Sequence, residues 1–321
     1  MNKALIIGHQ WPEPNSSAAG TRMLQLIGCL QSGGYAVEFA CAASASEFAV
    51  DLESMQVLTH RILLNDSSFD RFVADLKPEI VLFDRFMTEE QFGWRVQNNS
   101  PNTVRILDTE DMHCLRHARQ IAAKANRSVL RSDYMTDLAK REIASIFRCD
   151  LSLIISSFEM QWLQSEFQIP EQQIHYVPFM VDNPESKKKD WLAYEMREHF
   201  ISIGNFLHAP NWDAVRFLKS EIWPLIRAKL PAAQLHVYGA YADQKVNEMH
   251  DEKSGFLLKG RAEDALEVIG KSRVLLAPLR YGAGLKGKLL DAMLAGTPSV
   301  TTSIGAEAMH GDLPWGGIIE N

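Results

Sequence analysis

Two lysines, Lys286 and Lys288, lie beside a glycine-rich turn that joins a predicted strand to a predicted helix. Gly282 and Gly284 let the backbone turn tightly and let a ligand approach without a Cβ in the way. The free N–H groups and the dipole at a helix start favour an anion, by roughly 0.3–1 kcal/mol at an exposed site. The dipole itself does not favour lysines there, so the pair indicates an anion between them and the helix. We therefore predict a phosphate site that includes Leu285.

Asp291 extends this pattern along the same helix. Gly284, Lys288 and Asp291 are spaced at i, i+4 and i+7 and share a face. A phosphate near Lys288 would place a ribose near Asp291, whose carboxylate can accept hydrogen bonds from two hydroxyls. The alternative is a surface i,i+3 ion pair of Lys288 with Asp291. The residues alone leave both interpretations open.

The same turn, residues 282–287, also matches the G-x-G-x-x-G pattern of dinucleotide sites. A dinucleotide site requires an acid at the end of the following strand. That strand ends in Val300-Thr301-Thr302-Ser303, and the motif does not follow the first strand of the chain. A dinucleotide cofactor is therefore not expected.

A second polar cluster follows the predicted strand 104–107. Its acids and histidine lie at the carboxyl end of a strand, where α/β proteins form their sites, and Asp111 and His113 are the candidates. Alternatively, Asp108 or Thr109 caps the next helix and His113 lies on its surface. The spacing of the acids does not form a metal motif, so no metal is predicted.

Arg85 follows another predicted strand, residues 80–83. It could contact an anionic acceptor or an internal carboxylate, and we favour the carboxylate. His9, after the first strand, is a weaker candidate.

Short apolar runs alternate with helical periodicity, which predicts parallel sheets covered by helices on both faces. Strands are predicted at residues 4–7, 37–41, 61–64, 80–83, 104–107 and 151–155, and helices at 21–31 and 127–147. The pattern stops in a polar stretch with three consecutive lysines, and then restarts. The second set has strands at 200–203, 235–238, 256–258, 274–277 and 299–302, and a helix at 212–229 capped by Asn211.

We therefore predict an α/β protein of two Rossmann-like, doubly wound domains that face each other across a cleft. The boundaries are an N-terminal domain at 1–180, a linker at 181–195 and a C-terminal domain at 196–321. The last residues, WGGIIEN, look like the start of a further unit, so the second domain is expected to be truncated or minimal.

Net charge, cysteine spacing and the length of apolar runs exclude some classes of function. The formal net charge of −7 over 321 residues makes the chain a poor general binder of nucleic acid. The four cysteines are dispersed at no metal-binding spacing, and no run of 18 apolar residues occurs, which favours a cytoplasmic protein. Basic residues including Arg127, Arg131 and Lys140 could contact a membrane surface, but interleaved acids favour a solvated helix face. The oligomeric state is not indicated.

Three stretches of the sequence carry a family resemblance: residues 279–302, the segment 202–205 and the run HAPNWDAVRFLKSEIWPLIRAKLPAAQLHVYG. Together they resemble the C-terminal domain of the family 4 retaining glycosyltransferases, which have the GT-B fold. The start, with Gly20-Thr21-Arg22 after the first strand, is also similar. The resemblance covers most of the chain and is strongest over 200–302.

The resemblance implies a nucleotide-sugar donor, UDP- or GDP-linked, on the C-terminal domain, a carbohydrate or glycolipid acceptor, and no cofactor or metal. It implies that Asp291 holds the ribose and that Lys286 and Lys288 neutralise the diphosphate. Gly20 approaches that diphosphate from the N-terminal domain. An acid that is usual in the family falls on Ala283 here.

Further contacts follow from the same resemblance. It places Arg22 by the first loop, Gly204 and Asn205 after the first strand of the second domain, and His113 and Asp111 near the transferred sugar. The expected reaction is glycosyl transfer with retention of configuration. The alternatives are a nucleotide-sugar epimerase of the same fold and a degenerate transferase that binds nucleotide without turnover.

Overall fold

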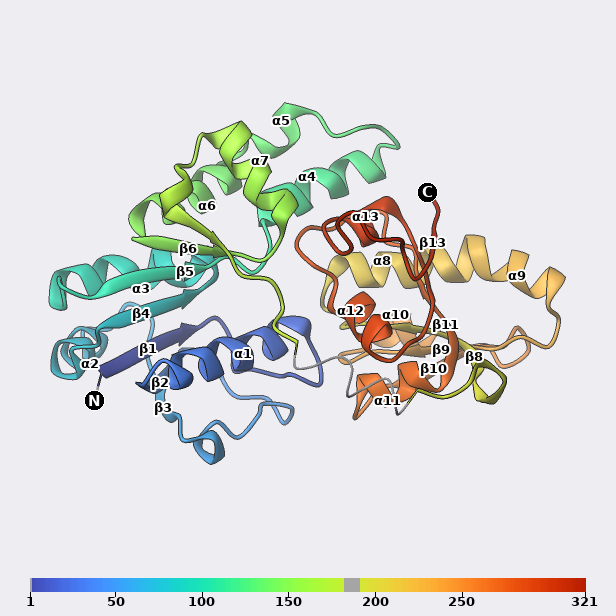
Figure 1. The fold of residues 1–321 in the computed structure, drawn as a ribbon, viewed down its shortest axis with the longest axis horizontal. Helices are drawn as coiled ribbons and strands as arrows, with labels where there is room; N and C mark the ends of the chain where they lie inside the picture. The colour runs from blue at the N-terminus through green and yellow to red at the C-terminus, as the bar shows by residue number, and fades with distance from the viewer. Residues whose placement is uncertain (1, 182–190) are drawn as a thin grey trace. The chain divides into compact units, whose positions relative to one another are not determined.

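The computed structural model describes residues 2–181 and 191–321, which form two compact units (Figure 1). The N-terminal unit contains the described residues of 1–14, 19–122 and 128–180, and the C-terminal unit contains the others. Residues 182–190, which hold the lysine run of the predicted linker, lie outside the described residues. No helix in the described part of the chain is long and apolar enough to cross a membrane.

The N-terminal unit is built on a parallel sheet with the strand order β3-β2-β1-β4-β5-β6-β7. Its strands are β1 (Asn2–Gly8), β2 (Tyr35–Cys41), β3 (Leu58–Arg61), β4 (Ile80–Asp84), β5 (Val104–Asp108), β6 (Leu151–Ile154) and β7 (Ile174–Tyr176). Leu5, Ile6 and Phe39 are fully buried, as expected for central strands covered on both faces. The strand order reverses between β1 and β4, and such a switch point is where open α/β sheets bind ligands.

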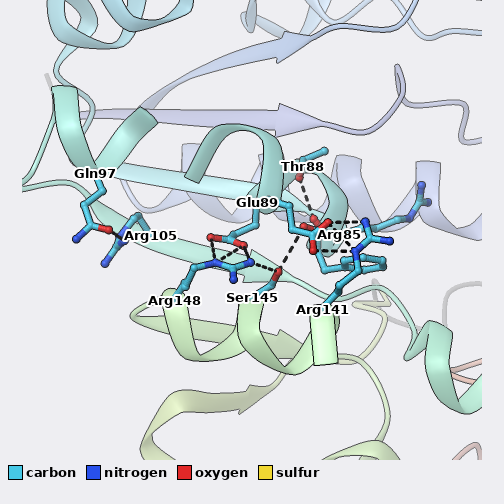
Figure 2. Close-up of polar contacts among 10 residues, drawn as sticks. Arg85, Thr88, Glu89, Gln97, Arg105, Arg141, Ser145 and Arg148 are labelled. Carbon is cyan, nitrogen blue, oxygen red and sulfur yellow. Dashed lines mark hydrogen bonds and ion pairs between the residues drawn. The ribbon is translucent and has the colours of Figure 1, made fainter. Parts of the chain in front are cut away.

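Helices connect these strands in the alternation that the sequence predicts. They are α1 (Ala18–Ser32), α2 (Ser68–Leu76), α3 (Arg85–Asn99), α4 (His113–Lys124), α5 (Arg131–Tyr134), α6 (Asp137–Arg148) and α7 (Ser157–Phe167), with short 3₁₀ turns at Glu53–Met55 and Glu171–Gln173. Polar contacts join α6 to α3, as Figure 2 shows. Arg148 pairs with the buried carboxylate of Glu89, and Arg141 Nε donates to Glu90 Oε1 at 3.0 Å. These pairs fix the two helices against each other.

Two predicted elements of this unit are placed differently. The strand predicted at 61–64 is β3, three residues earlier, where its residues pair with Glu38–Cys41 of β2. Leu63 and Leu64 are 54% and 50% exposed, so their apolar character does not mark a buried strand. The long helix predicted at 127–147 is broken, because Thr136 has an extended backbone (ψ 174°) before α6.

The C-terminal unit has a second parallel sheet, with the order β10-β9-β8-β11-β12-β13. Its strands are β8 (Glu198–Ile203), β9 (Leu235–Tyr238), β10 (Phe256–Gly260), β11 (Ser272–Ala277), β12 (Ser299–Thr301) and β13 (Gly317–Ile319). Its helices are α8 (Ala209–Phe217), α9 (Trp223–Lys229), α10 (Gln244–Asn247), α11 (Ala265–Gly270), α12 (Gly287–Leu294) and α13 (Ser303–Ala306), and a 3₁₀ turn precedes β8 at Tyr194–Met196. The C-terminal stretch expected to open a further unit contributes β13, an exposed strand paired with β12.

The helix predicted at 212–229 begins earlier and is not continuous. His208 is the residue before α8, and Pro210 lies in the first turn of α8. A backbone N–H in this turn would have no partner within the helix, so the N–H that proline lacks is not needed there. A π-helical turn, Leu218–Ile222, separates α8 from α9. Asn211 is therefore inside the first turn of α8 rather than its cap, which leaves its side chain available for a tertiary contact.

Candidate functional site

The switch point of the C-terminal sheet lies between β8 and β11, which are neighbours. Gly204 directly follows β8, and the glycine-rich turn follows β11 and leads into α12. Because parallel strands present their carboxyl ends at one edge, the two loops and the start of α8 come together there. We call the group formed by Gly204, Asn211 and Lys288 the β8–α12 site.

Lys288, in the first turn of α12, is the central cation of this site. Its Nζ donates to Asn211 Oδ1 at 2.8 Å, and within the described part of the chain it forms no ion pair with a carboxylate. Burial lowers the pKa of Lys288 to about 7. An ammonium that is partly buried without a counter-ion is unfavourable, and an anion bound here would reduce that cost.

Asn211 and Gly204 complete the site from the β8 side. Asn211 Nδ2 donates to Asn205 O at 2.9 Å, and the Asn205 side chain accepts from Leu207 N at 2.8 Å. A Cβ on Gly204 would lie 2.7 Å from both Asn211 Cγ and Lys288 Nζ. A larger residue at the end of β8 would therefore force these two side chains to move. The sequence pattern predicts Asn211 only as a helix cap and misses its contact with Lys288; the signal for an earlier helix start is Pro210.

Lys286 stabilises the glycine-rich turn from within. Its Nζ donates to Gly284 O at 2.6 Å and to Ala283 O at 3.2 Å. Gly284 has a φ of 63°, a left-handed conformation that suits glycine. A Cβ on Gly282 would meet Lys286 Cε at 3.3 Å, and Leu285 beside it is partly buried. The turn predicted from the glycines is present, while the binding role of Lys286 stays a prediction.

Asp291 lies one turn further along α12. Burial, and to a lesser extent the charge of Asp264, raises the pKa of Asp291 to about 6. Lys288 contacts Asn211 and not Asp291, so the alternative of a surface ion pair is wrong. A partly buried carboxylate with a raised pKa, three residues from a partly buried lysine, is typical of a binding site.

An ion pair between a solvent-exposed arginine and a buried carboxylate holds the loop after β11 against α8. Arg280, in that loop, binds the buried carboxylate of Asp213 on α8, with Nε 2.8 Å from Asp213 Oδ2. Asp213 also accepts from Arg216 at 3.3 Å. Both arginines therefore have a carboxylate partner, whereas Lys288 has none among the described residues.

In the N-terminal unit, polar side chains follow β1, β4 and β5 at the switch point. His9 N donates to Asp84 Oδ2 at 3.0 Å, and Arg85 Nε lies 3.6 Å from Asp84 Oδ1. Arg85 therefore contacts an internal carboxylate, the interpretation favoured from the sequence. Its φ of 70° is left-handed, a strained conformation that often occurs at functional sites.

Glu110 is the second strained residue of this edge, with a φ of 59°. Burial, and next the charge of Asp108, raises the pKa of Glu110 to about 8. Glu110 Oε1 and Asp84 Oδ1 are buried and have no hydrogen-bond partner among the described residues. Because buried carboxylate oxygens normally accept hydrogen bonds, these two can accept from a ligand. The sequence pattern predicts Asp111 and His113 as site residues at this position, but not Glu110.

Asp111 and His113 lie close together at the start of α4. Asp111 forms an ion pair with Arg116, and His113 Nε2 is 3.6 Å from Asp111 Oδ1. The His113 ring meets the Phe86 ring edge-on, with centroids 5.5 Å apart. His113 is partly buried rather than a surface residue, in contrast to the alternative interpretation.

The amides at the start of α4 are bonded to carboxylates from other helices. His113 N and Cys114 N each donate to Glu142 at 2.7 Å, and Met112 N donates to Glu159 Oε1 at 3.0 Å. The expected local caps do not form. Asp108 pairs with Arg22, and Thr109 Oγ1 donates to Leu153 O at 3.1 Å. Tertiary contacts therefore position His113.

Arg22 and Gly20, predicted to bind substrate, have structural contacts. The fully buried Arg22 guanidinium donates to Asp108 and, at 2.6 Å, to Val177 O. A Cβ on Gly20 would lie 2.4 Å from the backbone of Glu13, so α1 packs closely there. Their roles in binding stay predictions.

The described side chains do not form a metal centre. Within residues 2–181 and 191–321, no group of three or more His, Cys, Asp or Glu side chains could hold a metal ion.

Residues 197–318 match the family model described as Glycosyl transferases group 1. This segment contains the whole β8–α12 site together with Lys286 and Asp291. No curated protein sequence matches the chain.

Solved structures resemble the chain over nearly its full length. A glycosyltransferase from Rickettsia africae has a TM-score of 0.63 at 12% identity, covering 95% of this chain and 80% of its own. The Anabaena protein HepE in complex with UDP and glucose has a TM-score of 0.63 at 13% identity, covering 95% and 82%. Sucrose-phosphate synthase from Thermosynechococcus elongatus has a TM-score of 0.62 at 13% identity, with the same coverage.

At these identities the structures show the fold, and it is the predicted GT-B type with two Rossmann-like domains. The family match and the structures together support the prediction of a glycosyltransferase enzyme.

Proposed function

We propose that this chain transfers a sugar from a nucleotide-diphosphate sugar to a hydroxyl acceptor, with retention of configuration. One observation carries the proposal: Lys288 is a partly buried ammonium that no described carboxylate neutralises, at the start of a helix. That helix lies in the segment that matches the glycosyltransferase model. The start of a helix favours an anion, and the diphosphate of a donor bound there would also neutralise Lys288.

The donor contacts follow from the positions of the residues on α12. Lys288 and the first amides of α12 bind the diphosphate, and Asp291, one turn on, accepts from the ribose hydroxyls. Gly204 and Gly284 provide close approach to the backbone, and Lys286 holds the turn in shape. UDP-linked donors are the first candidates because the similar HepE was solved with UDP and with UDP-glucose, and GDP-linked donors are the second.

The acceptor is a hydroxyl of a carbohydrate or glycolipid. Glu110, Asp111 and His113 in the N-terminal unit support this assignment, because the first has a buried oxygen without a partner and the others lie beside it in sequence at the end of β5. Carboxyl oxygens accept hydrogen bonds from hydroxyls. A hydroxyl-bearing acceptor therefore suits this edge.

The chemistry is a substitution at the anomeric carbon. The bond between the sugar and the diphosphate breaks, its electron pair stays on the phosphate oxygen, and an oxocarbenium-like centre forms, as in glycoside hydrolysis. Lys288 and the α12 amides stabilise the growing charge on the leaving group, which lowers the barrier because that charge is largest in the transition state. The acceptor oxygen then bonds to the same face of the sugar, its O–H bond breaks, and the proton passes to an oxygen of the leaving diphosphate.

The proposal requires neither a cofactor nor a metal, and we propose a cytoplasmic location because three of the four cysteines are buried and free. A glycolipid acceptor would bring the enzyme to a membrane. The exposed residues Val129, Leu130 and Arg131 combine apolar and basic character suited to such a peripheral contact.

The first test is a thermal-shift screen with UDP-, GDP- and ADP-sugars, followed by titration calorimetry, because a ligand that binds the native state raises its stability. Nucleotide release with and without acceptors then separates a transferase from an epimerase, which converts donor alone, and from a protein that only binds. If folded wild-type protein binds no nucleotide diphosphate or nucleotide sugar, the proposed function is wrong.

A further inference from the structure

The partner of Lys288 in the β8–α12 site is an amide, Asn211, and not an acid. The other charged groups on the surrounding elements either contact other residues or lie further along α12. Asp213 of α8 binds Arg280, and the Lys286 ammonium contacts carbonyls of its own turn. Asp291 lies three residues on from Lys288 and, among the described residues, has no ion pair with it.

This choice of partner has a chemical consequence. An ammonium has three donors and no acceptor, and Lys288 uses one donor on Asn211 Oδ1. A carboxylate at the same place would neutralise the charge and compete with a phosphate. A neutral amide fixes the direction of the ammonium and leaves both its charge and its other two donors for a ligand.

The geometry of Asn211 is fixed at its other end as well. Its Nδ2 donates to Asn205 O at 2.9 Å, so its oxygen is directed to Lys288. The opposite amide orientation would bring two donor groups together, which makes this assignment unambiguous. Gly204 lies against both side chains, because a Cβ there would be 2.7 Å from each of them.

We infer that Asn211 is a positioning residue, which holds the Lys288 ammonium at the switch point of the C-terminal sheet as an unneutralised cation for a nucleotide diphosphate. This inference rests on the proposed function, because it assumes that a nucleotide diphosphate binds beside Lys288. Asn211 then also determines how the binding of a nucleotide diphosphate depends on pH.

That dependence can be measured in binding alone. The pKa of Lys288 is lowered by burial to about 7, so the ammonium of the free protein loses its proton as the pH rises above that value. A diphosphate stabilises the charged form, and binding is then coupled to proton uptake at alkaline pH. The affinity of wild-type protein should fall by up to about tenfold per pH unit above about pH 7.

The experiment is calorimetric titration of the full chain with UDP, GDP and ADP between pH 6 and pH 9, continued with the nucleotide that binds. In Asn211→Asp, the added carboxylate beside the ammonium should raise the pH at which the nucleotide affinity begins to fall, by about 1–3 pH units. It should also weaken binding at pH 6.5, because the carboxylate competes with phosphate. Asn211→Ala should weaken nucleotide binding by roughly tenfold without raising the pH at which the affinity begins to fall.

Asn247→Asp is the matched control, because Asn247 is exposed on α10 of the same unit and the change adds the same charge. It should leave both the affinity and its pH profile unchanged. Thermal denaturation of each variant shows whether the fold is retained, because Asn211→Asp keeps the shape of the side chain but loses the donor to Asn205 O.

The outcomes separate the two claims. If wild-type protein binds none of the three nucleotides, the proposed function fails and the role of Asn211 fails with it. If wild-type protein binds and Asn211→Asp keeps the wild-type pH profile, the inference about Asn211 is overturned while the proposed function stands. An upward shift in Asn211→Asp that Asn247→Asp does not show supports the inference.

Discussion

The guanidinium of Arg22, on α1, donates to both carboxylate oxygens of Asp108 at the end of β5, at distances of 2.8–3.1 Å, and neither side chain is exposed. Removing one member of a buried pair leaves the other charge uncompensated. We therefore expect Arg22→Met to lower the free energy of unfolding by about 3–5 kcal/mol, measured by urea denaturation.

The double variant Arg22→Met with Asp108→Leu is the control for this pair. Because both charges are removed, it should recover much of the lost stability. If Arg22→Met is as stable as wild type but loses nucleotide affinity, Arg22 has the binding role suggested by resemblance and not the structural one.

Lys288 and Lys286 should differ when each is replaced. Lys288→Met keeps the apolar stem and removes the charge, so it should weaken nucleotide affinity by about tenfold or more and leave stability equal or higher. Lys286→Met removes the contacts with Ala283 O and Gly284 O, so it should lower the melting temperature. Calorimetry and thermal denaturation of both variants check this. Equal effects of the two changes on affinity would contradict the different roles assigned here.

Gly204→Ala tests the close packing of the β8–α12 site. The new Cβ would lie 2.7 Å from Asn211 Cγ and from Lys288 Nζ, so both groups must move. We expect a loss of nucleotide affinity of at least about tenfold with a small change in melting temperature. The control is Gly28→Ala, because a Cβ at this helical position on α1 would meet no atom within 4 Å. An unchanged dissociation constant in Gly204→Ala would show that the site is looser than described.

Glu142, which accepts from His113 N and Cys114 N, should make stability depend on pH. Burial raises the pKa of Glu142 from its ordinary value of 4.5 to about 7. A raised acid pKa gives a contribution that is fully present below about pH 4.5 and is lost as the pH rises through about 7. Glu142→Gln should remove this dependence, seen as a flatter curve of unfolding free energy between pH 4.5 and 7. The exposed Glu171→Gln should not change the curve, and a wild-type curve in Glu142→Gln would disprove the assignment.

Glu110 should affect transfer and not donor binding. Its buried Oε1 has no hydrogen-bond partner among the described residues, and its pKa is raised to about 8. We expect Glu110→Gln to lower the rate of transfer to a hydroxyl acceptor by about 10²-fold or more while the nucleotide dissociation constant stays the same. Any change of the wild-type rate near pH 8 should disappear in this variant. A variant with normal transfer would remove Glu110 from the acceptor side.

The order of apolar strands and helices was set by the sequence, because hydrophobic periodicity depends only on which face of an element is buried. That is why β1, β4, β5 and β11 lie where the pattern placed them. The glycine-rich turn was also predictable, since Gly284 adopts a left-handed φ that other residues avoid. Together these features were sufficient to place Lys288 and Asp291 at the start of one helix.

Only the tertiary structure decided which side chains meet. Asn211 and Lys288 are 77 residues apart, and Arg22 and Asp108 are 86 apart, so no local spacing relates them. The local pattern indicates a helix cap at Asn211, and the resemblance implies a ligand contact at Arg22, whereas Asn211 contacts Lys288 and Arg22 is buried in an ion pair. Hydrogen bonds between distant residues depend on how strands order themselves in a sheet, and that order follows from packing rather than from any local pattern.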